Sequence, residues 1–338
     1  MKRVALILLL SSGITGLYSQ TGGDNVYEFL NLSPNAYISS LGGFNISSPG
    51  SDPSMAILNP ALAGPGYNGN LALNYVNYFA GINYGSIMYS RHSDSLGSFA
   101  AGISYLNYGR FDRTDESGNM NGYFRAAEYS FNLLYSVHID SIISLGVNLK
   151  PVISQLESYT SLGLGIDLGA YWESREGNMS AGLTLRNAGL QITTYSGQRE
   201  KLPFEICAGF SARLRYAPLR FSLTARHLEK YRLIHDYDED EAATYSKSGE
   251  IAENLLRHLI FGVEIIPSEN FFLAAGFNYQ RRKELIYEEK TSTVGLSLGA
   301  GIKTSSVDII ISRARYHLAG SSTNFSLLLK PSLFARSK

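Results

Sequence analysis

Residues 295–299, GLSLG, are the stretch whose residue types come closest to known catalytic chemistry. They match the G-x-S-x-G pattern, in which a sharp strand-to-helix turn exposes a nucleophilic serine. Here Ser297 lies inside a run in which apolar and small residues alternate, and that run predicts a strand without a turn. We therefore expect no catalytic serine at this position, and the sequence predicts that the protein is not an enzyme.

A second candidate is the acidic run in which Asp236, Asp238 and Asp240 have the spacing of calcium-binding residues. The sixth position of the loop is Glu241 instead of glycine, and the twelfth is Lys247 instead of glutamate, so it is not an EF-hand. We expect a solvated acidic loop, with weak divalent-ion binding as the alternative. The six histidines are scattered, with no paired Cys/His spacing, so no metal or cofactor site is predicted.

Residues 20–68 precede the predicted strands and do not show their alternating pattern. We expect this block to form a plug with short helices. Asp52 is a good N-cap, Pro53 suits the first position of a helix, and Pro60 is expected to end that helix. The alternative is a disordered arm, which is disfavoured because the block carries too many apolar residues to stay in water. These residues are Ile46, Met55, Ile57, Leu58 and Leu62.

The N-terminus has the features of a secretory signal peptide. Lys2 and Arg3 give it a positive start, and a short apolar core over residues 4–10 precedes a small, polar stretch. We expect residues 1–19 to be removed. A membrane anchor is the alternative, and it is disfavoured because the apolar run is far shorter than the ~20 residues that a spanning helix needs.

Composition narrows the class of protein. The 29 basic and 29 acidic residues give no net charge and so no sign of nucleic-acid binding. Cys207 is the single cysteine, which excludes an internal disulfide. The 23 tyrosines and 33 glycines suit a membrane barrel, which uses aromatic residues at the membrane surfaces and small residues against a plug. A secreted β-sandwich could share this composition.

Large apolar residues alternate with small or polar ones throughout residues 69–330, and this period of two predicts strands. The expected strands are 69–78, 82–91, 98–108, 122–138, 141–153, 158–173, 178–188, 203–215, 219–229, 257–266, 269–281, 291–303, 306–316 and 321–330. The polar face is rich in small residues, which suits a lumen packed against a plug. The sequence therefore predicts an all-β fold, a fourteen-stranded antiparallel transmembrane β-barrel, followed by a C-terminal tail over 331–338.

Connection lengths separate a barrel from a sandwich. Every second connection is short, whereas most of the others are long, as expected for periplasmic turns and extracellular loops of an outer-membrane barrel. The long ones are 109–121, 189–202, 230–256 and 282–290. This order would place both termini in the periplasm.

The predicted inner face carries charges of both signs, which we expect to pair with each other or with the plug. These charged residues are Glu128, Lys150, Asp167, Arg186, Glu205, Arg213, Arg226 and Lys303. The same face leaves space at glycines, which the plug is expected to fill. These glycines are Gly163, Gly165, Gly182, Gly276, Gly295 and Gly299. We therefore expect an occluded lumen and not an open porin channel.

The motif Asp52, Asn59, Pro60 and Ala61, ahead of fourteen expected strands, resembles the FadL-like outer-membrane barrels and is expected to belong to the plug. More narrowly, the chain resembles the PorQ-like proteins of the type IX secretion system. The matching stretches are 20–32, 73–86, 107–124, 146–169, 217–228 and 313–322.

The PorQ-like resemblance implies a barrel without catalytic activity or cofactor that anchors a PorZ-like surface protein in the outer membrane. Through that protein it would join a PorU-like sortase and a PorV-like shuttle barrel in an attachment complex for exported cargo proteins. The alternative is a FadL-like transporter of hydrophobic small molecules, which should have a kinked strand, a movable plug and an apolar tunnel. A barrel enzyme should bring a Ser or Asp together with a His at one rim, and the sequence offers no such set.

Overall fold

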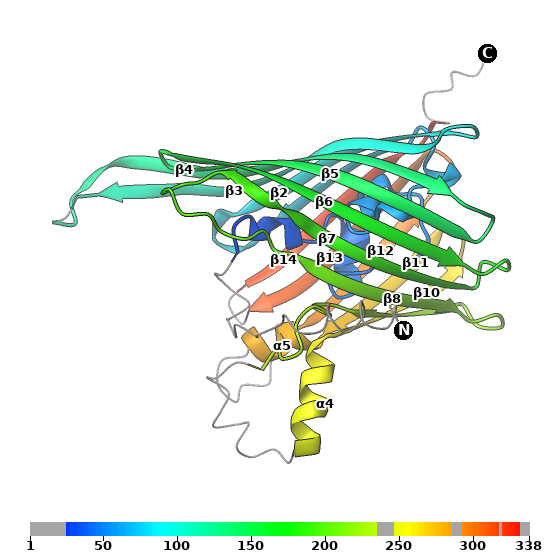
Figure 1. The fold of residues 1–338 in the computed structure, drawn as a ribbon. Helices are drawn as coiled ribbons and strands as arrows, with labels where there is room; N and C mark the ends of the chain where they lie inside the picture. The colour runs from blue at the N-terminus through cyan, green and yellow to red at the C-terminus, as the bar shows by residue number, and fades with distance from the viewer. Residues whose placement is uncertain (1–24, 116, 235–246, 286–292, 318–319, 332–338) are drawn as a thin grey trace, which may run out of the picture.

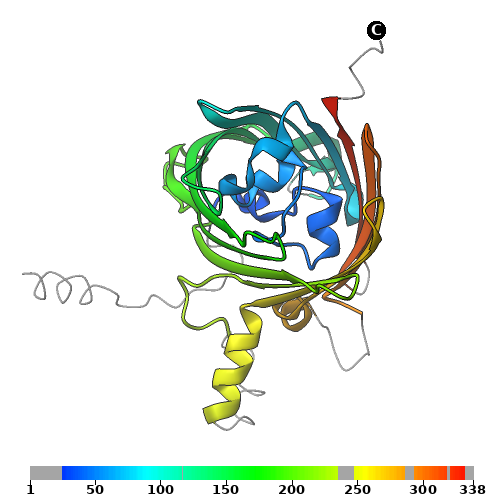
Figure 2. The same cartoon turned by 90° about the vertical axis from the view of Figure 1, so that its right-hand side faces the viewer.

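The computed structural model describes residues 25–115, 117–234, 247–285, 293–317 and 320–331. Within these ranges, fourteen strands form one closed barrel, in which sequence neighbours pair antiparallel and β1 closes the ring against β14. Figure 2 shows the ring with the N-terminal segment inside it. The predicted fourteen-stranded antiparallel barrel is therefore confirmed. The signal peptide and the acidic loop at Asp236, Asp238 and Asp240 lie outside the described residues.

The strands, in chain order, are β1 (Leu71–Asn77), β2 (Asn83–Ser93), β3 (Gly97–Thr114), β4 (Met120–His138), β5 (Ile143–Leu156), β6 (Tyr159–Glu173), β7 (Met179–Thr193), β8 (Glu205–Arg213), β9 (Leu219–Ala225), β10 (Leu259–Ser268), β11 (Phe271–Asn278), β12 (Leu296–Lys303), β13 (Val307–His317) and β14 (Gly320–Leu329). The helices and 3-10 turns are η1 (Glu28–Asn31), α2 (Ala36–Ser40), η2 (Pro53–Ile57), η3 (Pro60–Leu62), η4 (Pro65–Tyr67), η5 (Phe79–Gly81), α4 (Lys247–Arg257) and α5 (Tyr279–Leu285). No described helix is long and apolar enough to cross a membrane.

Side-chain burial follows the period of two. Leu133 is 52 % exposed on the outer face of β4, whereas Ser130 is 1 % exposed on its inner face. A closed barrel with an apolar outer face satisfies all its backbone groups within the wall, so it can cross a bilayer. This architecture is that of an outer-membrane protein.

The expected loop over 109–121 is mostly strand, because β3 and β4 continue well beyond the predicted ends. Cross-strand aromatic contacts accompany this extension: the rings of Phe111 and Phe124 stack with their centroids 5.2 Å apart. The resulting β3–β4 hairpin projects past the rest of the rim in Figure 1. The predicted strand over 269–281 also differs, since β11 ends at Asn278 and α5 follows it.

The first and last described residues lie at opposite ends of the barrel. The backbone N–H of Val26 donates to the carbonyl of Lys201, in the connection from β7 to β8. The backbone N–H of Lys330 donates to Ser306, in the turn from β12 to β13. We call the end that carries the β3–β4 hairpin, the β7–β8 connection, α4 and α5 the outer end, and the opposite end the inner end. The termini themselves, for which we expect a common location in the periplasm, lie outside the described residues.

The sidedness of the barrel can be tested by labelling single cysteines on intact cells with a membrane-impermeant maleimide. We expect Asp115→Cys, at the tip of the β3–β4 hairpin, to react, and Asp94→Cys, in the turn between β2 and β3, to stay unlabelled. The native Cys207 is buried and should stay silent. Labelling at position 94 but not at 115 would mean that the inner end faces the cell exterior.

Candidate functional site: the plug and the lumen wall

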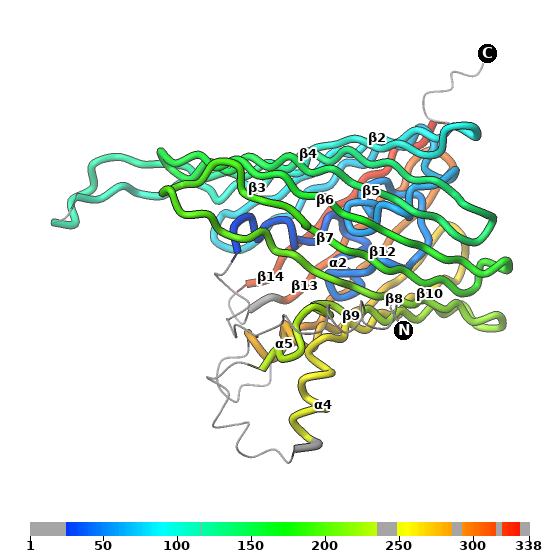
Figure 3. The backbone as a smooth tube through the Cα atoms, in the orientation of Figure 1, coloured from blue at the N-terminus to red at the C-terminus, as the bar shows by residue number. Residues whose placement is uncertain are grey.

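The N-terminal segment crosses the lumen from the outer end toward the inner end before it enters β1. In Figure 3 this blue segment lies inside the barrel, with α2 in the middle of the path. Helix α2 packs on β11–β14. Across the lumen, η3 packs on the inner face of β4, β5 and β6. The plug therefore touches opposite walls of the barrel.

Two plug residues tie its short helices together. The Asn35 side-chain carbonyl accepts a hydrogen bond from the backbone N–H of Ile38 and so caps α2. Its amide nitrogen donates to the carboxylate of Asp52 at 3.1 Å. Asp52 in turn accepts from the backbone N–H of Ser54 at 2.8 Å and caps η2. Burial raises the pKa of the Asp52 carboxyl. Asp52 thus holds two helices in one unit.

Asn59, Pro60 and Ala61 connect the plug to the wall. The Asn59 side-chain oxygen accepts from the N–H of Ala61, and its amide nitrogen donates to the carbonyls of Ile46 at 2.9 Å and Ala170 at 3.2 Å. Because Ala170 belongs to β6, this amide joins the plug backbone to the barrel backbone. Pro60 begins η3, so it opens a second 3-10 turn after the one that ends near Ile57.

Glycines of the wall let the plug backbone approach closely. A Cβ at Gly276 would lie 2.0 Å from the backbone nitrogen of Gly42, and one at Gly182 would lie 2.3 Å from the carbonyl oxygen of Ile46. Any side chain there would displace the plug. The plug also fills the space at Gly163 and Gly299, as expected. The expectation fails at the other two positions: Gly165 meets Leu202 of a connection, and Gly295 has a positive φ of 86° at the outer rim.

A β-bulge in β7 builds the polar centre of the lumen. Ile166 pairs with Ala188 and Leu168 with Leu185, so two residues, Arg186 and Asn187, oppose Asp167 alone. Asn187 takes a left-handed φ of 54°, which asparagine tolerates well. The side chains of Arg186 and Asn187 are both buried in the lumen.

The first half of this polar centre surrounds Asp167. Its carboxylate lies 2.6 Å from the ammonium of Lys150 and accepts the backbone N–H of Asn187 at 2.8 Å and the amide of Asn148 at 3.1 Å. The ammonium of Lys150 also donates to the Asn187 side chain at 3.1 Å. The buried charges are thus paired and hydrogen-bonded, as a dry lumen requires.

The second half surrounds Glu205. Its carboxylate lies 2.8 Å from the guanidinium of Arg186 and 2.6 Å from that of Arg226. Arg186 also donates to the plug carbonyl of Leu30 at 2.9 Å. The guanidinium carbons of Arg186 and Arg226 lie 4.8 and 4.1 Å from the centroid of the Phe44 ring. The wall therefore binds the plug through a hydrogen bond and cation–π contacts.

The other charged residues of the predicted inner face have separate roles. Glu128 accepts a hydrogen bond from the Tyr108 hydroxyl at 2.5 Å, and the Lys303 ammonium lies 5.0 Å from the ring of Phe272. Arg213 is exposed at the inner rim, where β8 ends. The expected pairing of mixed charges is confirmed for the Asp167 and Glu205 groups.

Ser297 is a plug contact in this fold. Its hydroxyl accepts the backbone N–H of Gly42 at 2.9 Å and donates to the carbonyl of Ser40 at 3.0 Å. It lies in β12, with no sharp turn around it. Among the described residues, no group of three His, Cys, Asp or Glu side chains could hold a metal ion.

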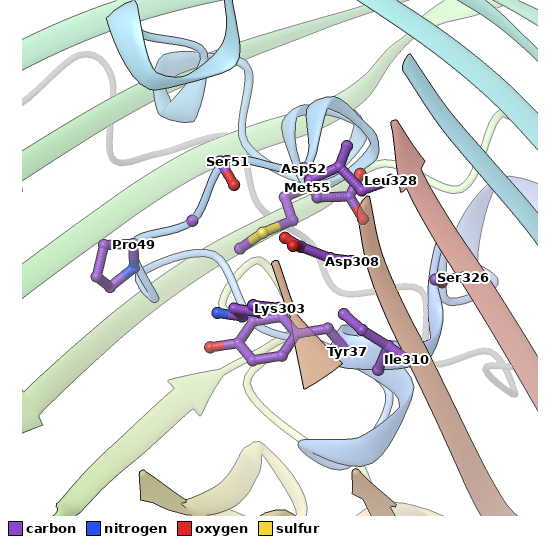
Figure 4. Close-up of a pocket in the computed structure, with 11 residues that line it drawn as sticks. Tyr37, Pro49, Ser51, Asp52, Met55, Lys303, Asp308, Ile310, Ser326 and Leu328 are labelled. Atoms are coloured by element: carbon purple, nitrogen blue, oxygen red, sulfur yellow. The ribbon is translucent and has the colours of Figure 1, made fainter. Parts of the chain in front are cut away.

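Two cavities border the plug, one at each end. The cavity at the outer end has a volume of about 440 Å³ and a mixed polar lining that includes Glu28, Arg226 and Arg281. The pocket nearer the inner end, shown in Figure 4, lies between the plug and β12–β14 beside Asp52 and Lys303. It has a volume of about 30 Å³, which is room for about one water molecule.

Between these cavities the lumen is filled. Many inward side chains from around the ring are at most 2 % exposed, so little surface beside the plug can touch water. They include Asn132, Asn148, Asp167, Cys207, Ser297, Ser312 and Asn324. The lining mixes polar side chains with apolar ones that pack on the plug, such as Met88, Leu134 and Phe272, and each pair of neighbouring strands is hydrogen-bonded. In the part of the chain that the structure describes, strand pairing closes the wall and the plug occupies the lumen.

No protein-family model matches the sequence, and no curated protein matches it. Solved structures match the fold. The toluene transporter TbuX of Ralstonia pickettii aligns with a TM-score of 0.53 and 13 % identity, over 90 % of this chain and 98 % of TbuX. The toluene transporter TodX of Pseudomonas putida aligns with a TM-score of 0.53 and 12 % identity, over 88 % and 97 %. The chain therefore has the fold of the FadL-like outer-membrane barrels.

Proposed function

We propose that this protein is a non-enzymatic outer-membrane barrel that anchors a surface protein at its outer end. The observation that supports this proposal is the sealed lumen, in which the plug leaves almost no water-accessible surface between the two end cavities. A sealed lumen gives no path for a solute but makes a rigid base for a partner. The function then depends on what projects from the outer end.

The β3–β4 hairpin is the element best suited to hold such a partner. It extends beyond the rim of the barrel, and its far part exposes Phe111, Met120 and Tyr123. The guanidinium of Arg110 lies 3.9 Å from the centroid of the Tyr123 ring. Aromatic and arginine side chains are the ones that most often dominate binding between proteins.

The resemblance of six sequence stretches to the PorQ-like proteins suggests which partner this is. We infer a PorZ-like surface protein, and through it a PorU-like sortase and a PorV-like shuttle barrel of the type IX secretion system. One of these stretches, residues 107–124, contains most of the hairpin that projects from the rim. The surface attachment of exported cargo proteins is the process that this inference implies.

Transport of hydrophobic small molecules is the second candidate. It is supported by the fold, since TbuX and TodX are described as toluene transporters. For this chain, transport would require the plug to leave contacts such as the Asn59–Ala170 hydrogen bond and the Phe44 cation–π pair. The comparisons favour transport, whereas the filled lumen favours anchoring.

Affinity purification from outer membranes tests the anchoring proposal. In the test variant, Asn-Gly replaces residues 111–124, so a tight turn closes the hairpin at the paired Arg110 and Arg125. We expect the intact barrel to retain a large surface protein and the shortened barrel to lose it. Tyr216→Ser, in an exposed turn at the inner end, is the matched control and should retain it. A barrel that purifies with no surface protein, or a shortened variant that keeps it, would contradict the proposal.

A further inference from the structure

Helix α4 is an amphipathic helix whose apolar side faces outward. Ile251 is 62 % exposed and Leu255 is 59 % exposed, and Leu256 beside them is also exposed. The charged residues Glu253 and Arg257 of the same helix are buried. A helix that covers a protein core has the opposite arrangement, with charged residues outside. The exposed apolar side therefore needs an apolar surrounding other than the described protein.

Contacts with α5 explain why the charged side is buried. The Tyr279 hydroxyl donates to the carboxylate of Glu253 at 2.5 Å, and the ammonium of Lys283 lies 3.6 Å from the same carboxylate. The guanidinium of Arg257 lies 3.3 Å from it, one turn along α4. These contacts fix the rotation of α4 about its own axis.

The fixed rotation determines what the apolar side faces. Successive helical residues are about 100° apart, so Ile251 and Leu255 lie on the side of α4 opposite Glu253 and Arg257. In Figure 1, α5 lies farther toward the outer end than α4. The side of α4 turned away from α5 therefore faces toward the inner end, beside the wall and not against it. Figure 2 shows that α4 extends sideways from the ring, beyond the wall.

An outward apolar groove of the barrel lies close to the end of α4 along the chain. Residue 259, two positions after the end of α4, begins β10, and Phe261 of β10 lines an outward groove with a volume of about 390 Å³. Other outward residues of the groove are Phe210, Phe221, Leu223, Phe277 and Leu296. They lie on the face that meets the hydrocarbon of the membrane. Three residues thus separate the end of α4 from Phe261 of this lipid-facing groove.

We propose that α4 is an interfacial helix whose Ile251 and Leu255 enter the outer-end leaflet of the membrane, with lipid acyl chains in the groove beneath. Amphipathic helices of this kind lie in the membrane surface with their apolar side a few ångströms below the head groups. The ion pairs of Glu253 hold α4 against the rim, so the lipid contact orients the outer loops relative to the membrane. This role does not depend on whether the barrel anchors a partner or transports a solute.

Tryptophan fluorescence in brominated lipid tests this proposal, because bromine quenches an indole only at contact. The single native tryptophan is removed by Trp172→Phe, and Leu255→Trp is introduced into that background. The folded variant, identified by heat-modifiable migration, is reconstituted into phosphatidylcholine vesicles brominated near the head groups or near the chain ends. Ser117→Trp, at an exposed position near the tip of the β3–β4 hairpin, is the solvent control, and Leu133→Trp, on the outer face of β4, is the lipid control.

We expect bromine near the head groups to reduce the emission of Leu255→Trp by roughly twofold, and bromine near the chain ends to reduce it less. Ser117→Trp should show neither effect. Unquenched, red-shifted emission from Leu255→Trp would overturn the proposal and place this side of α4 in water. Unquenched, blue-shifted emission would also overturn it, since protein and not lipid would then cover this side of the helix.

Discussion

Glu205→Gln should destabilise the barrel by about 3–5 kcal/mol, because the removal of one partner leaves buried charges without compensation. The carboxylate of Glu205 lies between two guanidinium groups, and Arg186 is fully buried while Arg226 is only slightly exposed. Glutamine has nearly the same shape as glutamate, so the loss arises from charge and not from a cavity. Reversible unfolding in guanidinium, with the barrel in detergent micelles, gives the free energy of unfolding.

Two further variants make this test specific. Glu157→Gln removes one partner of the exposed Arg113–Glu157 pair and should cost less than about 1 kcal/mol. Glu205→Gln combined with Arg226→Gln should recover part of the loss, since one of the two uncompensated cations is gone. If Glu205→Gln lowers the free energy of unfolding no more than Glu157→Gln does, water reaches Glu205 and its two arginines, and the lumen is not sealed.

Most strands of the wall could be predicted from the sequence. In a strand with one apolar and one polar face, apolar and polar residues alternate along the chain with a period of two. Leu133 and Ser130 show this relation, with one residue facing lipid and the other the lumen. The N-cap at Asp52 was equally predictable, since a short polar side chain before a proline is a local signal. Such features depend on neighbours in sequence alone.

Other features depend on contacts between distant residues and were missed. The bulge at Arg186 and Asn187 brings a second polar side chain into the lumen. Two consecutive polar residues between Leu185 and Ala188 were the one local signal for it. The partners of Glu205 and the contact between Phe44 and the arginines come from four separate parts of the chain. No spacing rule could have found these contacts.

Removal of the plug should have the largest effect on permeability. A variant that lacks residues 25–63 retains every strand of the barrel, and its inner face carries serine and asparagine side chains that hold water. We expect it to conduct ions in planar bilayers, with a conductance at least roughly tenfold above that of the intact protein, as in water-filled barrels. The intact protein should show almost no conductance because the plug fills its lumen.

A point variant provides a milder form of the same test. Gly276→Val should push the plug from the wall, since a Cβ there would lie 2.0 Å from the nitrogen of Gly42. We expect intermittent conductance from it. Gly66→Val is the matched control, because nothing lies within 4 Å of a Cβ at that position, and it should stay silent. Silence of both the plug-free variant and Gly276→Val would contradict the assignment of residues 25–63 as the seal.

The central claim, that this barrel is a sealed anchor and not a passage, is tested most directly by the uptake of labelled toluene into intact cells. Toluene is the appropriate probe because TbuX and TodX share this fold. We predict that cells with the intact protein take up toluene no faster than cells without it, whereas cells with the plug-free variant take it up faster. Uptake through the intact protein that exceeds the background and saturates with toluene concentration would contradict the claim.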